Sequence, residues 1–155
     1  SRFDEASAAV APQYPDTVYT VINGTASDSD NMVPVFPKEY EGSYLAGIIA
    51  GYTTENGKFA TEGGESNAAM VKLLDTYDCV VASVNMNWSN VYPWIVEGIA
   101  SGELKGAQEV GVAEGVFEAI YTDAVSDECK SAVEQATQDI TDGKIDFTQY
   151  FSEAE

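Results

Sequence analysis

The sequence contains no histidine, and this absence excludes several common catalytic and metal sites. A serine or cysteine nucleophile has no histidine base, and neither an HExxH zinc motif nor any other histidine-ligated metal site can form. Two cysteines, Cys79 and Cys129, are too few for a four-cysteine site. We therefore expect no metal and no other cofactor. Each cysteine is interpreted either as a buried small apolar residue or as half of a Cys79–Cys129 disulfide, which an extracellular setting would permit.

Basic residues are also scarce, because 7 Lys and Arg stand against 26 Asp and Glu, a formal net charge of −19. Phosphate backbones and anionic membranes bind clustered Lys or Arg, so we expect no nucleic-acid partner. Long apolar runs are missing too: the longest, 44–50, is far shorter than the roughly 20 residues of a membrane-spanning helix. The chain as given is expected to be soluble. Its abrupt start at Ser1 leaves open a processed leader or an N-terminal truncation.

What the sequence does contain is an alternation of strand-like and helix-like segments. This pattern is typical of an α/β fold with a largely parallel sheet flanked by helices. At 155 residues, we expect 1–155 to form a single α/β unit. The predicted strands are 18–22, 32–36, 59–61, 79–84, 109–112 and 116–121. The predicted helices are 3–10, 39–52, 66–74, one that Ser89 caps and Gly102 closes, and one that Ser126 caps and Gly143 ends.

The segment 39–52 is the most informative of the predicted helices. Its bulky residues fall at helical spacing, and small residues, including Gly42, Gly47 and Gly51, lie between them. Each glycine costs a helix about 1 kcal/mol relative to alanine, so we expect the helix to be buried and to approach a neighbouring element closely. The apolar run 79–84, in contrast, predicts a strand that is covered on both faces.

Motifs for enzymatic chemistry are weak, and we expect no enzyme activity. Ser83 follows a predicted buried strand but lacks a Gly-x-Ser-x-Gly context and a base, and Gly63-Gly64 fits neither dinucleotide nor Walker patterns. The polar loop 27–31 has the aspartate spacing of a calcium loop without its glycine or its distal glutamate.

A binding function is easier to support, because ligands of parallel α/β sheets lie beyond the carboxyl ends of the strands. An indole flanked by amides, as at 85–88, can stack on a flat ring and bind its edge. The candidate ligand-binding residues are Trp88, Asn85, Asn87, Glu65, Ser66 and Gly64. Two other readings stay open: Trp88 supports the start of a helix, and the two asparagines bond locally within a turn.

Several segments carry the motifs of one family. They are Tyr14-Pro15-Asp16 through Ile22-Asn23-Gly24; Val35-Phe36 with 40–47; Thr54, Gly57, Lys58, Gly63 and Gly64; 81–84 with Asn87-Trp88, then Gly98, Gly102 and Gly106; and 140–144. Together they resemble the basic membrane protein (Bmp, PnrA-like) family of substrate-binding lipoproteins of ABC transporters.

That resemblance implies a type I periplasmic-binding fold of two α/β lobes, with 1–65 similar to the end of the N-terminal lobe and 77–155 to the C-terminal region. It also implies an extracellular or periplasmic lipoprotein, whose lipid anchor is not present in this chain. Such a protein binds a nucleoside or similar small solute between its lobes, at the turns 64–66 and 85–88, and delivers it to a transporter permease.

The sequence departs from the family in length. Family chains are longer, and the first strands of one lobe, together with a block between Gly64 and Tyr77, have no counterpart here. The chain is thus either a part of a longer protein, with an awkward join within 64–77, or a shortened relative. In the second case the alternative function is a structural or surface-assembly subunit that binds no ligand.

Overall fold

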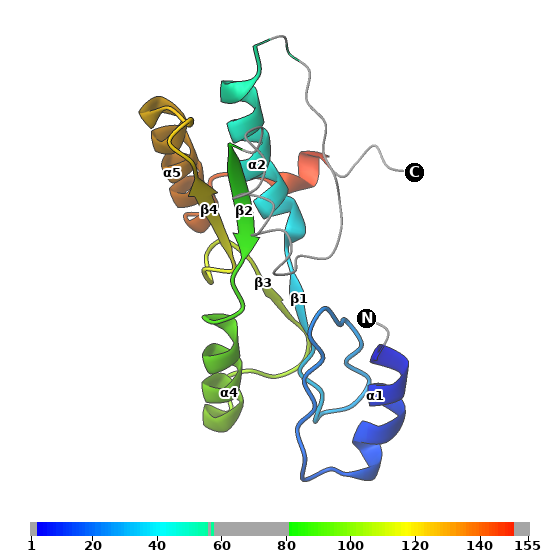
Figure 1. Ribbon diagram of the computed structural model, residues 1–155. Coiled ribbons are helices and arrows are strands. Elements are labelled where there is room, and N and C mark those ends of the chain that lie inside the picture. Colours follow the sequence, from blue (N-terminus) through cyan, green and yellow to red (C-terminus); the bar gives the residue numbers. More distant parts are fainter. Residues whose placement is uncertain (1–2, 56, 58–80, 151–155) are drawn as a thin grey trace. The chain divides into compact units, whose positions relative to one another are not determined.

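The computed structural model describes residues 3–55, 57 and 81–150 (Figure 1). It shows a mixed α/β fold, as the alternating pattern predicts. The chain divides into two compact units: unit 1 comprises Ser1–Glu39 and Asn87–Val116, and unit 2 comprises Tyr40–Met86 and Phe117–Glu155. The chain therefore passes between the units three times, after Glu39, Met86 and Val116.

Unit 1 contains three parallel segments. Strand β1 (Val35–Pro37) pairs in parallel with β3 (Gln108–Val110), with Val35 opposite Gln108 (Figure 1). The segment 19–22 joins the other edge of β1 through parallel bridges from Tyr19 to Met32 and from Ile22 to Val35. The order is thus 19–22, β1, β3, which confirms the parallel sheet that the sequence predicts.

The predicted strands 18–22 and 32–36 are correct in place but less regular than expected. Along 19–22 only isolated bridges form, and regular strand structure begins at Val35. Pro34 explains the late start, because it has no N–H to donate to the neighbouring strand; its carbonyl still accepts a hydrogen bond from the Gln108 N–H at 2.8 Å. The core of this region consists of Ala11, Val21 and Met32.

Two helices belong to unit 1, α1 (Asp4–Val10) and α4 (Val91–Ser101), and a short 3-10 turn, η1 (Ala11–Gln13), follows α1. Helix α4 buries Val91, Ile95 and Gly98 and ends at Gly102, which has the positive φ of 78° that the predicted stop requires. The predicted cap is wrong. Asn90, not Ser89, occupies the N-cap position, and its side chain accepts no capping hydrogen bond from the helix.

In unit 2, β2 (Ala82–Met86) and β4 (Phe117–Tyr121) form an antiparallel pair, with Met86 opposite Phe117. This corrects two expectations for the run 79–84. The strand is half-buried along its length rather than covered on both faces, and its partner is antiparallel. The chain leaves unit 2 at Met86 and returns opposite it at Phe117, so β4 must run back along β2.

Within the described residues of unit 2, the helices are α2 (Glu39–Thr53) and α5 (Asp127–Thr141), and the 3-10 turn η2 (Phe147–Tyr150) follows α5. Helix α2 confirms the predicted helix 39–52 and buries one side, including Leu45 and Ile49. The close approach is real at Gly42, where an added Cβ would lie 2.6 Å from the ring of Phe117. Gly47 and Gly51 are exposed, with no described atom within 4 Å of an added Cβ.

Helix α5 has the predicted ends. The Ser126 hydroxyl accepts a hydrogen bond from the Cys129 N–H at 3.2 Å, and Gly143 follows the helix with a φ of 67°. Cys129 is a buried free cysteine, and burial raises the pKa of its thiol. Cys79, the predicted strand 59–61, the predicted helix 66–74 and the join within 64–77 lie outside the described residues. Among the described helices, none has the length and apolar character needed to cross a membrane.

Candidate functional site

The turn 87–90 lies at the carboxyl end of β3, in unit 1. The Asn87 N–H donates to the Val116 carbonyl at 2.6 Å, and the Asn90 side-chain amide donates to the Gly115 carbonyl at 3.4 Å. Both acceptors belong to the loop 111–116 that follows β3. The turn therefore occupies the end of a parallel sheet where ligands of α/β proteins usually bind.

Asn87 is one of the predicted ligand residues, and the structure uses part of its side chain locally. Its Oδ1 accepts a hydrogen bond from the Ser89 N–H at 3.0 Å, as the local-turn reading expects. The Nδ2 group makes no hydrogen bond to another described residue. Asn87 can therefore offer a ligand two N–H donors, while one lone pair of its oxygen is already used within the turn.

Trp88 is half-buried and starts helix α4. Its carbonyl accepts hydrogen bonds from the N–H groups of Val91 at 3.0 Å and Tyr92 at 3.1 Å. Its indole stacks on the Tyr92 ring, with centroids 6.1 Å apart and planes at 29°. Tyr92 is 52% exposed, so the pair presents aromatic surface to solvent. The Trp88 backbone thus supports the start of the helix, while its indole offers a surface on which a flat ligand can stack.

Of the other predicted site residues, the structure describes only Asn85. Asn85 was expected beyond the end of its strand, but β2 continues through Met86, and Asn85 pairs with Glu118 inside unit 2. The strand is longer than predicted because Phe117 and Glu118 supply pairing partners for its last two residues. Gly64, Glu65 and Ser66 lie outside the described residues.

The loop 111–116 lies beside the turn and is held by hydrogen bonds of its own. Glu114 Oε2 accepts a hydrogen bond from the Gly111 N–H at 2.7 Å, and the Val116 N–H donates to the Gly111 carbonyl at 3.0 Å. Gly115 has a φ of 70°, a conformation that favours glycine. The predicted strand 109–112 ends at the start of this loop, whereas the role of Asn90 was not predicted from the sequence and follows only from its hydrogen bond to Gly115.

The loop 27–31, with its calcium-like spacing, is held by hydrogen bonds of its own. The Ser29 hydroxyl donates to Asn31 Oδ1 at 2.5 Å. The Asn31 amide group donates to the carbonyls of Ala11, Tyr14 and Thr17, at 2.9, 3.1 and 2.8 Å. Across the described ranges, no three His, Cys, Asp or Glu residues form a group that could hold a metal ion. Asn31 thus anchors the backbone of a neighbouring segment.

Comparison with known proteins decides the family. Residues 1–87 match the sequence model of the Bmp family, described as ABC transporter substrate-binding protein PnrA-like. The chain belongs to the Bmp family. Two relatives of this Bmp chain are CD4+ T-cell-stimulating antigens of Listeria, 31% identical in Listeria innocua serovar 6a and 30% in Listeria monocytogenes serovar 1/2a, each over 86 residues. The match covers 56% of this chain and 24% of each relative, so the aligned segment is about a quarter of the relatives' length.

Solved structures of similar fold support the same architecture. A transcriptional activator of the comK gene from Bacillus halodurans superposes with a TM-score of 0.72 at 13% identity, over 93% of this chain and 77% of that one. An ABC transporter solute-binding protein from Aeropyrum pernix K1 gives a TM-score of 0.63 at 14% identity, over 93% and 74%. At these identities the similarity shows a shared fold.

Proposed function

We propose that this Bmp chain captures a small ring-bearing solute, such as a nucleoside, outside the cytoplasm and delivers it to the permease of an ABC transporter without chemical change. Family membership supports the general role of substrate binding for such a transporter. Anchoring at the cell surface as a lipoprotein belongs to the same proposal.

The observation that carries the proposal is the half-exposed aromatic pair of Trp88 and Tyr92 at the carboxyl end of β3. Stacking of a base on an aromatic side chain contributes about 1–3 kcal/mol. Beside the indole, the Asn87 amide can donate hydrogen bonds to the edge of a ring, which gives orientation as well as affinity. The loop 111–116 fixes the backbone of this turn, so little ordering is required on binding.

The remaining candidates stay predictions that rest on the family resemblance. Asn85 is a ligand contact in this proposal although it lies within β2, and Gly64, Glu65 and Ser66 are contacts from a segment outside the described residues. Substitution of each by alanine, followed by a binding measurement, assigns or removes it individually.

A fluorescence titration tests the proposed function. The chain has two tryptophans, so the Trp94→Phe variant leaves Trp88 as its single indole. We expect saturable quenching of Trp88 by a nucleoside, because a stacked base contacts the indole directly. Nucleosides, nucleobases and sugars that all leave the emission of the folded variant unchanged would contradict solute capture and favour the assembly-subunit alternative.

A further inference from the structure

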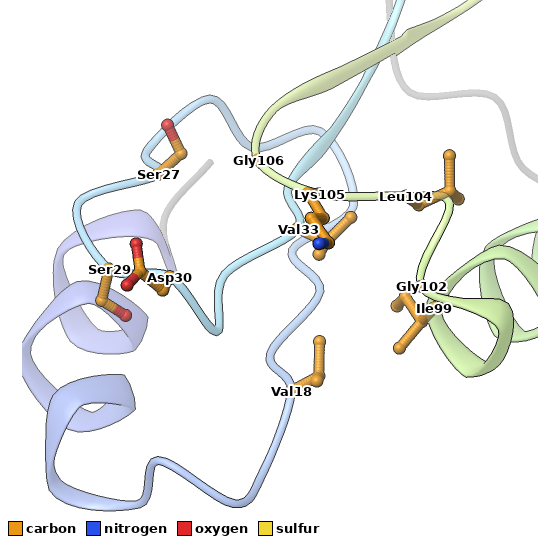
Figure 2. Close-up of a pocket in the computed structure, with 10 residues that line it drawn as sticks. All are labelled: Val18, Ser27, Ser29, Asp30, Val33, Ile99, Gly102, Leu104, Lys105 and Gly106. Carbon is orange, nitrogen blue, oxygen red and sulfur yellow. The ribbon is translucent and has the colours of Figure 1, made fainter.

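Unit 1 has a concave surface at the amino ends of its parallel segments (Figure 2). A pocket of about 490 Å³ opens there. Val18 precedes the segment 19–22, Asp30 precedes the extended chain that leads into β1, and Lys105 precedes β3. All three segments therefore enter the sheet at this pocket, so it lies at their amino ends, whereas Trp88 lies at the carboxyl end of β3.

One part of the pocket is apolar. Val33 is almost completely buried, with 3% exposure, and Ile99 and Leu104 are half-buried. Val18 is 46% exposed and lies nearest the solvent. Four aliphatic side chains in one concave surface favour a ligand with an aliphatic part.

The same pocket carries one charge of each sign. Asp30 and Lys105 both line it; Ser29 lies beside Asp30, and Ser27 lies further along the same loop (Figure 2). Neither Asp30 nor Lys105 forms an ion pair within the described part of the chain, and they do not pair with each other. Lys130 and Lys144, in contrast, both contact carboxylates. Because Lys105 has no carboxylate partner among the described residues, its ammonium group can bind a ligand carboxylate.

The loops that form the pocket are held by hydrogen bonds and by close packing. Asn31 fixes the loop that carries Asp30, through its bonds to three backbone carbonyls. On the other side, Gln108 Nε2 donates to the Lys105 carbonyl at 2.9 Å. Leu104 packs so closely on Gly98 that an added Cβ would lie 2.4 Å from Leu104 Cγ. The backbone of both loops and the Leu104 side chain are therefore held in place around the pocket.

We propose that this pocket binds a small zwitterion with an aliphatic side chain, a ligand of the amino-acid class. The ligand ammonium pairs with the Asp30 carboxylate, assisted by the hydroxyl groups of the same loop. Its carboxylate pairs with the Lys105 ammonium, and its side chain contacts Val33 and Leu104. The volume lies within the range of about 300–1,000 Å³ that small-molecule sites occupy. This site is independent of the proposed solute site at Trp88.

Calorimetry and amide NMR on the whole 155-residue chain test the proposal, with L-leucine as the probe and two analogues that each lack one charge. We expect leucine to bind and to shift the amide resonances of Lys105 and Gly106. The amine 3-methylbutylamine and the acid 4-methylpentanoate should each bind about fivefold more weakly, the effect of losing one exposed ion pair.

Two variants assign the charges. Asp30→Asn should lower the affinity for leucine and for the amine by about fivefold and leave the affinity for the acid unchanged. Lys105→Gln should lower the affinity for leucine and for the acid by about fivefold and leave the affinity for the amine unchanged. Asp123→Asn and Lys130→Gln, exposed or half-exposed charges outside the pocket, serve as matched controls and should change nothing.

Three results would overturn the proposal. One is the absence of any leucine-dependent shift at Lys105 and Gly106 at millimolar leucine. Another is binding that Asp30→Asn and Lys105→Gln both leave intact in folded protein. The third is a set of shifts confined to the turn 87–90, which would place leucine at the other end of the sheet.

Discussion

Asn31 connects two segments of unit 1 through a single side chain. Its amide group bonds three carbonyls of the stretch that follows α1, and its oxygen accepts the Ser29 hydroxyl. We expect Asn31→Asp to lower the free energy of unfolding by about 1–3 kcal/mol, because a carboxylate cannot donate the hydrogen bonds that the amide gives to the three carbonyls. Urea denaturation measures the change.

The control for this variant is Asn90→Asp, which removes one long hydrogen bond of 3.4 Å to the Gly115 carbonyl. It should cost less than Asn31→Asp. Equal losses for the two variants would show that Asn31 is an ordinary loop residue rather than an anchor.

Ionisation of Cys129 should make the stability of the protein depend on pH in alkaline solution. Burial raises the pKa of its thiol above the ordinary value, so the unfolded chain releases the thiol proton at a lower pH than the folded chain does. Stability should therefore be unaffected by this group in neutral solution and should fall as the pH rises above about 8.5, the pKa of a free cysteine. Tyr121, whose pKa is also raised by burial and by Cys129, adds to the fall at higher pH.

The Cys129→Ala variant separates the two groups. It should start from a lower stability, because a buried side chain is truncated, but its stability should decline less steeply between about pH 8.5 and 10. Thermal denaturation at a series of pH values measures both slopes. A variant that keeps the full steepness would exclude the thiol as the cause.

Among the secondary-structure elements, α2 shows how an element can be predicted while its contacts cannot. The length of α2 follows from the helical spacing of its bulky residues. The two ends of α5 are likewise predictable, because helix caps and stops depend on residues that are close in the sequence. Which glycine of α2 meets a partner depends on β4, whose residues lie far away in the sequence. The sequence therefore predicts a close approach somewhere along the helix, and only the structure assigns it to Gly42.

We expect Gly42→Ala to destabilise the protein by about 1–3 kcal/mol, because the new methyl group overlaps the Phe117 ring. Gly47→Ala is the matched control on the same helix. There an added Cβ meets no described atom, so the higher helix propensity of alanine should raise stability by up to about 1 kcal/mol. Urea midpoints of the two variants that moved in the same direction would contradict the packing of α2 on β4.

Strand boundaries were less predictable than helix boundaries. Apolar runs suggest regular strands at 18–22 and 32–36, but Pro34 removes a donor and the ladder stays irregular up to Val35. In β2 the error is of the opposite kind, because cross-strand partners on β4 extend the strand over Asn85 and Met86. The periodicity of a segment indicates its propensity to form a strand, whereas the ends of that strand depend on the distant segment with which it pairs.

At the scale of the whole molecule, the family and the α/β fold follow from the sequence, while the solute site stays a prediction. Trp88 and Asn87 lie in one turn because they adjoin each other in the chain. Asn85 lies in β2 instead, and the pocket that Asp30 and Lys105 line was not predicted from the sequence. Those two residues are 75 positions apart (105 − 30), and only the pairing of β1 with β3 brings their loops to one pocket.

The most direct test of the central claim is a calorimetric titration of the chain with a nucleoside, in the wild type, Trp88→Ala and Trp94→Phe. We predict saturable heat for the wild type, binding weakened by about 1–3 kcal/mol in Trp88→Ala, and little change in Trp94→Phe, with all three folded by circular dichroism. Unchanged binding in Trp88→Ala, or a folded wild type that gives no heat with nucleosides, nucleobases or sugars, would contradict a solute site at Trp88.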